Sequence, residues 1–106
     1  DNMVDMTKHR SPDAIEKTIS IPSIEAVKEF VNIAAEYTCD ATIENGRYAI
    51  DAKSILGVFS LDVTKPLTLV LETPSRIYNN KVDDRNDFIE AIRKFIVDDE
   101  PVKAEK

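Results

Sequence analysis

The most informative segment of this chain of 106 residues reads Asp51-Ala52-Lys53-Ser54-Ile55-Leu56-Gly57-Val58-Phe59-Ser60-Leu61. It places Ser54 directly before a cluster of apolar residues. Serine is favourable immediately before a helix, because its hydroxyl accepts a hydrogen bond from an N–H group that the first turn leaves free. The segment therefore predicts a short helix after Ser54. Its apolar residues are more than one buried face can hold, namely Ile55, Leu56, Val58 and Phe59.

Hydrophobic periodicity predicts a strand and a helix near the N-terminus. Residues 17–21 alternate between polar and apolar side chains, and Pro22 ends this first strand. Ser23 then precedes an apolar stripe at helical spacing, which predicts a helix that ends near Tyr37 and faces the core. The stripe consists of Ile24, Val27, Phe30, Val31, Ala34 and Ala35.

The rest of the chain predicts three strands and one further helix. Residues 40–44 and 47–52 flank Asn45-Gly46, a dipeptide that suits a two-residue hairpin turn because both residues tolerate positive φ. A fourth strand starts at Pro66, and in it Leu67, Leu69 and Leu71 alternate with Thr68 and Val70. A long polar connection follows over 73–86. An amphipathic helix follows, capped by one of Asp83, Asp84 or Asn86, and its apolar residues are Phe88, Ile89, Ile92, Phe95 and Ile96.

The predicted order is strand, helix, strand, strand, helix, strand, helix. It favours an α+β fold, an open-faced β-sandwich in which a four-stranded antiparallel sheet carries three helices on one face. We expect a flexible N-terminal arm over residues 1–15, one domain over 16–98 and an acidic C-terminal tail over 99–106.

Composition narrows the possible functions. With 14 basic and 20 acidic residues the formal charge is −6, which disfavours binding to nucleic acid or to an anionic membrane surface. The single cysteine, Cys39, cannot form an internal disulfide, and we expect it to be a packing residue. No apolar run is long enough to span a bilayer, so a cytoplasmic protein is expected. The sequence has no cofactor motif or metal-ligand spacing, so we expect no cofactor, no metal and no enzymatic activity.

The Ser54 segment resembles Asn-Ala-Lys-Ser-Ile-(Met/Leu)-Gly-Val-Met-Ser-Leu, which follows the third strand of HPr, the small phosphocarrier protein of the bacterial sugar phosphotransferase system. The resemblance extends over about residues 16–98 and implies the HPr fold. The loop 73–86 is longer than is usual in that family.

The resemblance also implies where a phosphoryl-accepting histidine would lie. HPr proteins carry Gly-(Leu/Ile)-His-(Ala/Thr)-Arg-Pro-Ala just before the first helix. An ungapped count places the histidine at Ser23 and the arginine at Glu25. The only histidine of the chain, His9, precedes the first strand, so we expect it to lie in the N-terminal arm and to take no part in phosphate transfer. The chain is therefore expected to lack histidine phosphocarrier activity.

The resemblance implies a regulatory role for Ser54, because HPr of Gram-positive bacteria is phosphorylated at the equivalent serine. The positions equivalent to Ile55, Leu56 and Phe59 form an exposed patch that docks partners in that family. The implied partners are an HPr kinase/phosphorylase or a transcriptional regulator. Two alternatives stay open, a structural or interaction module in which Ser54 is only a helix cap, and a working phosphocarrier that uses another residue.

Overall fold

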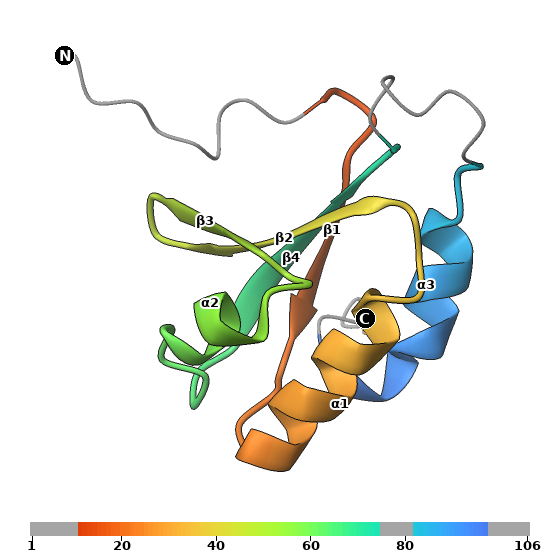
Figure 1. Ribbon diagram of the computed structural model, residues 1–106. Coiled ribbons are helices and arrows are strands. Elements are labelled where there is room, and N and C mark those ends of the chain that lie inside the picture. Colours follow the sequence, from red (N-terminus) through yellow and green to blue (C-terminus); the bar gives the residue numbers. More distant parts are fainter. Residues whose placement is uncertain (1–10, 75–81, 98–106) are drawn as a thin grey trace, which may run out of the picture.

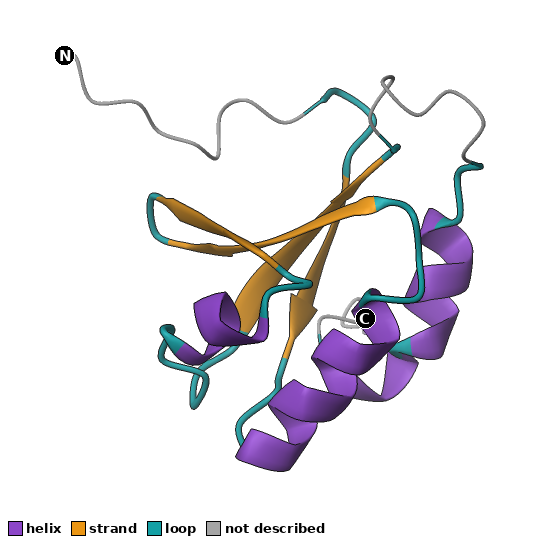
Figure 2. Ribbon diagram, viewed as in Figure 1, coloured by secondary structure: helices purple, strands orange, loops and turns teal. Residues whose placement is uncertain are grey.

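The computed structural model describes residues 11–74 and 82–97. They form a four-stranded antiparallel sheet with helices on one side of it (Figures 1 and 2). This confirms the predicted α+β open-faced sandwich. The elements are β1 (Ile15–Ile19), α1 (Ile24–Ala34), β2 (Asp40–Asn45), β3 (Tyr48–Asp51), α2 (Ile55–Phe59), β4 (Leu67–Glu72), α3 (Arg85–Ala91) and the 3₁₀ helix η2 (Arg93–Phe95).

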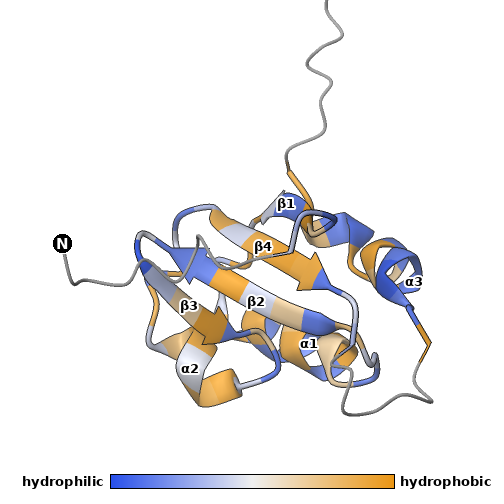
Figure 3. Ribbon diagram, turned by 90° about the horizontal axis from the view of Figure 1, so that it is seen from above, coloured by the Kyte–Doolittle hydropathy of each residue, from blue (hydrophilic) through white to orange (hydrophobic). Residues whose placement is uncertain are grey.

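The strand order in the sheet is β1-β4-β2-β3, so β4 lies between β1 and β2. Its central place explains its composition, since both edges of β4 are paired and four of its six residues are buried. Figure 3 accordingly shows β4 as hydrophobic over most of its length. The predicted alternation of β4 is incomplete, because Val70 is only 3% exposed although it lies on the face away from the helices.

The core fills the space between the sheet and the helices. Phe30 of α1 contacts Phe88 of α3 and Phe95 of η2, with ring centroids 6.2 and 6.0 Å apart. These rings cover one face of the sheet, where Ile43 and Leu69 are fully buried opposite one another. Burying aromatic side chains stabilises a small domain strongly, by about 2–3 kcal/mol each.

The first strand lies two residues earlier than predicted, over Ile15–Ile19 instead of 17–21. Its register ends where Ile19 pairs with Leu67, the first residue of β4. Beyond that point Ser20 donates its N–H to the carbonyl oxygen of Phe95, 2.8 Å away. After β1 the hydrogen-bond partner of the chain thus changes from β4 to η2.

The hairpin turn also differs from the prediction. Asn45 pairs with Tyr48, so the two central residues are Gly46 and Arg47. Only Gly46 has a positive φ, of 63°. Glycine at the first central position is the arrangement of a type II′ turn, which needs one residue with positive φ instead of the two that we expected.

The helix predicted over the last part of the domain is divided. α3 ends at Ala91, Ile92 departs from helical angles with φ −106° and ψ 14°, and η2 follows. This change of direction brings Phe95 into the core and lets Ile96 form an antiparallel bridge with Ile19. A continuous helix would have carried these residues past the sheet.

The first helix is shorter than predicted, ending at Ala34, and its stripe is narrower. Ile24 is 59% exposed and Ala35 is an exposed C-cap, so neither belongs to the core. Helical side chains tilt toward the N-terminus, and Ile24, in the first turn, therefore projects beyond the packed layer. The four buried residues of α1 are Val27, Phe30, Val31 and Ala34.

The structure describes only part of the two chain ends and of the loop 73–86. Ser11 donates from its backbone N–H and its hydroxyl to Glu72, at 2.6 and 3.0 Å, which places Ser11 at the end of β4. The rest of the expected N-terminal arm with His9, residues 75–81 of the loop 73–86, and the expected acidic tail lie outside the described residues.

Candidate functional site

Ser54 is the N-cap of α2, as predicted. Its backbone is extended, with φ −102° and ψ 106°, and its hydroxyl accepts a hydrogen bond from the N–H of Gly57 at 3.2 Å. The backbone N–H of Ser54 donates to the carbonyl oxygen of Asp51, so the turn between β3 and α2 is also closed behind the serine. Ser54 is half-buried, and its oxygen lies at the start of the helix.

Gly57 lets α2 lie directly on β3. A Cβ atom at this position would lie 2.7 Å from Cγ2 of Ile50 and 3.2 Å from the hydroxyl oxygen of Ser54. Only glycine fits this approach without movement of the strand side chain. The glycine of the Ser54 segment therefore fixes where the serine is held relative to the sheet.

The apolar residues of α2 are divided between core and solvent. Val58 is fully buried, and Ile55 is half-buried against the core. Leu56 is 80% exposed and Phe59 is 38% exposed. Exposed large apolar side chains that cluster on one short helix are typical of an interaction surface.

The position at which the resemblance places a histidine is the start of α1. Ser23 is the N-cap there, exposed, with its hydroxyl accepting from the N–H of Ala26 at 3.1 Å. Glu25 lies in the first turn and is exposed. Its negative charge complements the helix dipole. Exposed Ile24 lies between them, at a position that periodicity alone assigned to the core.

Sequence reasoning missed how Lys53 is held. Its ammonium group donates to the carbonyl oxygen of Tyr37, 2.7 Å away, just after the end of α1. Lys53 therefore links the segment that carries Ser54 to the turn between α1 and β2. The two residues are 16 positions apart in the sequence, so no local pattern could indicate this bond.

The same turn is held from its other side by Asp84. One carboxylate oxygen accepts from the N–H of Thr38 at 2.8 Å and the other from the N–H of Cys39 at 3.0 Å. Asp84 is the N-cap residue of α3, as one of the predicted alternatives had it, but its side chain makes no capping bond to that helix. Partial burial raises the pKa of this carboxyl group, but the two backbone N–H groups outweigh that effect and hold the pKa below its ordinary value.

Cys39 is buried, in agreement with its predicted role in packing. Burial, reinforced by the negative charge of Asp84, raises the pKa of the Cys39 thiol to about 12. A thiol is nucleophilic only after it loses its proton, so this cysteine is chemically inert at neutral pH.

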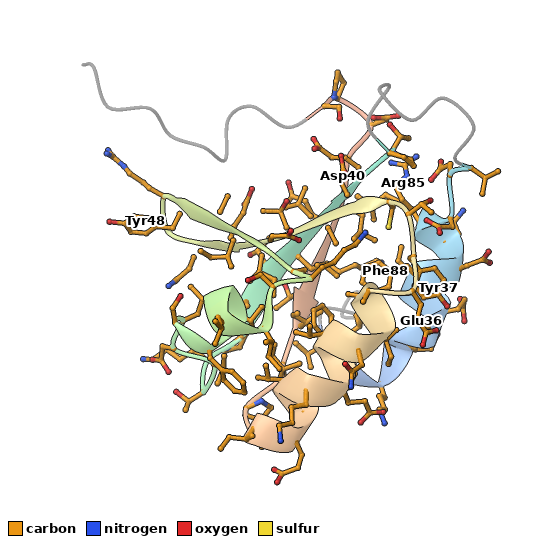
Figure 4. All side chains as sticks on the ribbon, in the orientation of Figure 1. Glu36, Tyr37, Asp40, Tyr48, Arg85 and Phe88 are labelled. Atoms are coloured by element: carbon orange, nitrogen blue, oxygen red, sulfur yellow. The ribbon has the colours of Figure 1, made fainter. Side chains whose placement is uncertain are left out.

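The outer face of the sheet carries a shallow cleft of about 450 Å³. Three of its seven lining residues are acidic, and one, Lys53, is basic. The lining residues are Asp40, Ala41, Thr42, Ala49, Asp51, Lys53 and Glu72. Asp40 and Tyr48 mark the two ends of the β2–β3 pair in Figure 4.

The described part of the chain, residues 11–74 and 82–97, has no group of three or more His, Cys, Asp or Glu side chains arranged to hold a metal ion. Nor does any helix within those residues reach the length and apolar character needed to cross a membrane.

Comparison with models of protein families gives a match over most of the described chain. A family model described as "PTS HPr component phosphorylation site" matches residues 24–97, which is more than half of the chain. The match begins at the residue after Ser23 and includes Ser54 and α2. No curated protein and no solved structure matches the chain.

Proposed function

Because this chain belongs to the HPr family of the sugar phosphotransferase system, we propose that it is a regulatory member that works through Ser54 and α2 instead of a phosphohistidine. Proteins of this family carry or receive phosphoryl groups and are not enzymes in the strict sense. The observation that carries the proposal is the pairing of Ser54, held at the start of α2, with the 80% exposed side chain of Leu56 two residues later.

The hydrogen bonding of the Ser54 hydroxyl supports phosphorylation of this residue. Its oxygen accepts a bond from Gly57, and among the described residues it donates none, so its proton is free to pass to a base of the kinase. In that reaction the Ser54 oxygen bonds to the γ-phosphorus of ATP, the bond from that phosphorus to the ADP oxygen breaks, and the hydroxyl proton leaves. The product is a stable phosphate ester, suited to regulation and unsuited to rapid onward transfer.

The exposed part of α2 supplies the docking surface for such a kinase. Leu56 and Phe59 present apolar area to solvent, while Ile55 and Val58 anchor the helix to the core. Leu56 lies only two residues after Ser54, which supports a docking surface close to the serine. The partners that fit are an HPr kinase/phosphorylase and a regulator that binds the phosphorylated form.

The start of α1 supports the loss of histidine phosphotransfer. Ser23, which takes the position of the histidine in the ungapped comparison, offers a hydroxyl that already caps the helix. A phosphoserine there would be a stable ester, whereas an imidazole accepts and releases phosphate near neutral pH. Glu25, in place of an arginine, would repel the incoming anion.

The experiment is incubation with an HPr kinase and ATP, followed by mapping of phosphate. We expect phosphoserine at Ser54 in the wild type and none in Ser54→Ala. The matched control is Ser23→Ala, which loses a helix cap of the same kind but keeps Ser54, and it should be phosphorylated like the wild type.

One alternative has an observation in its favour. The cap hydrogen bond from Gly57 gives Ser54 a structural role that needs no partner. Absence of phosphate from the wild-type protein in the kinase reaction would select this alternative, in which the chain is a structural or interaction module.

A further inference from the structure

The turn between α1 and β2, residues 37–39, lies between two segments that are far apart in the sequence. On one side Lys53 donates to the Tyr37 carbonyl oxygen at 2.7 Å. On the other, both oxygens of Asp84 accept the next two backbone N–H groups, those of Thr38 and Cys39. Three successive residues of the turn are therefore bonded to side chains from outside it.

Further contacts join the turn to the described end of the loop 73–86 and to α3. The Thr38 hydroxyl donates to the carbonyl oxygen of Val82 at 2.9 Å. The Tyr37 ring stacks on Phe88 of α3, with centroids 5.4 Å apart and an interplanar angle of 26°. Figure 4 shows Tyr37 and Phe88 side by side where the end of α1 meets α3.

The hydrogen bond between Lys53 and the Tyr37 carbonyl oxygen connects this anchored turn to the segment that contains Ser54. Lys53 precedes Ser54 in a turn that Asp51 also closes, by accepting the Lys53 N–H at 2.9 Å and the Ser54 N–H at 3.0 Å. A lysine side chain has four rotatable bonds and considerable rotamer entropy, so a lysine fixed on a half-buried carbonyl oxygen restrains its own backbone. Loss of that bond frees the residue next to the phosphorylation site.

We propose that Lys53 is a positioning residue for Ser54, and that Asp84 acts on the same site through the turn 37–39. The end of the loop 73–86, which contains Asp84, is thereby coupled to the start of α2. The coupling concerns how firmly Ser54 is held. Its kinetic consequence rests on the proposed function, whereas its structural consequence does not.

The structural test is amide hydrogen exchange at the start of α2, measured on the full chain. Lys53→Met should speed exchange at Gly57 and Val58 by about fivefold, the change expected for the loss of one hydrogen bond. Asp84→Ala, which removes two hydrogen bonds to the turn, should speed exchange at the same amides by at least as much. Lys53→Arg retains a donor of similar length and should restore most of the protection. Core amides of β4 serve as the internal reference for global unfolding.

The matched control is Asp83→Ala. Asp83 lies beside Asp84 but its carboxylate pairs with Arg85 at 2.8 Å and does not touch the turn. It should leave exchange at α2 unchanged. Equal acceleration at α2 and β4 in Asp84→Ala, or no acceleration at α2, would overturn the proposal.

The kinetic test uses the HPr kinase reaction. Asp84 bonds to a different part of the turn from Lys53. Asp84→Ala should nevertheless slow phosphorylation of Ser54 several-fold, and Asp83→Ala should leave its rate unchanged. A wild-type protein that is not phosphorylated defeats the proposed function but leaves the exchange prediction standing. Unchanged exchange in a protein that is phosphorylated normally defeats the coupling alone.

Discussion

Ser54 combines a structural role with a proposed regulatory one. Its hydroxyl caps α2 through the N–H of Gly57, and phosphorylation would use the same oxygen. The role of Ser54 as a cap followed from the sequence, because a serine before a short apolar run is a local signal. The Lys53–Tyr37 and Asp84–Thr38 bonds could not be predicted, because they join residues 16 and 46 positions apart.

Ser54→Ala should lower the free energy of unfolding by about 1 kcal/mol, because α2 loses its side-chain cap. Denaturant unfolding monitored by circular dichroism measures this loss. Ser60→Ala is a suitable comparison, since its exposed hydroxyl lies at the other end of α2, and it should cost less than about 0.5 kcal/mol. Equal stability of Ser54→Ala and the wild type would show that the cap contributes nothing.

The carboxylate of Asp84 should make stability depend on pH in the acid range. Its folded-state pKa lies below the unfolded-state value near 3.8, so its contribution is fully present above that value and is lost as pH falls through the folded-state pKa. At pH 7 Asp84→Asn should be less stable than the wild type by about 1–2 kcal/mol, since an amide oxygen replaces only one of two acceptors.

The difference between wild type and Asp84→Asn should shrink when unfolding is measured below about pH 4. A difference that stays constant from pH 7 to pH 3 would contradict the role of the charged carboxylate.

The packing of α2 on β3 depends on the lack of a side chain at Gly57. Alanine has a higher helix propensity than glycine, so propensity alone predicts that Gly57→Ala stabilises the helix. The 2.7 Å approach to Cγ2 of Ile50 predicts the opposite, a loss of about 1–3 kcal/mol in the free energy of unfolding.

A double-mutant cycle with Ile50→Ala separates the two effects. Removing the strand side chain creates space, so Gly57→Ala should cost less in that background than in the wild type. Additive losses in the cycle would mean that the contact between these positions is not the cause.

Element types could be predicted from the sequence, whereas several boundaries could not. Periodicity identified β1, α1, β4 and the region of α3, whereas the Asn45-Gly46 dipeptide indicated the β2–β3 hairpin and Ser54 indicated α2. The 3₁₀ helix η2 was not predicted as a separate element. The end of β1 depends on where β4 begins, and the break between α3 and η2 depends on the position of Ile19 in the sheet. The hairpin turn moved by one residue, since Gly46 alone satisfies a type II′ turn.

At the scale of the whole molecule, the open-faced sandwich leaves part of α2 and the start of α1 exposed to solvent. Both carry apolar side chains that the sheet does not cover, Leu56 and Ile24. The sequence predicted that α2 has more apolar residues than it can bury, because four of its five residues are apolar and one face cannot bury all four. It could not divide them into exposed and buried, since that depends on the approach of α2 to β3.

Leu56→Ser tests the docking surface. The side chain is 80% exposed, so the change should alter the free energy of unfolding by less than about 0.5 kcal/mol. The initial rate of Ser54 phosphorylation by an HPr kinase should fall about tenfold, as expected when an apolar anchor is removed from an interface. Val97→Ser, at a 53% exposed position outside α2, should not change that rate.

The most direct measurement compares two phosphoryl donors on the same wild-type protein. One sample receives the general phosphotransferase enzyme and phosphoenolpyruvate, and the other an HPr kinase and ATP. We predict that only the second sample gains a phosphate, that this phosphate is stable to acid, and that it maps to Ser54. Acid-labile phosphohistidine in the first sample, or no phosphate at Ser54 in the second, would contradict the account.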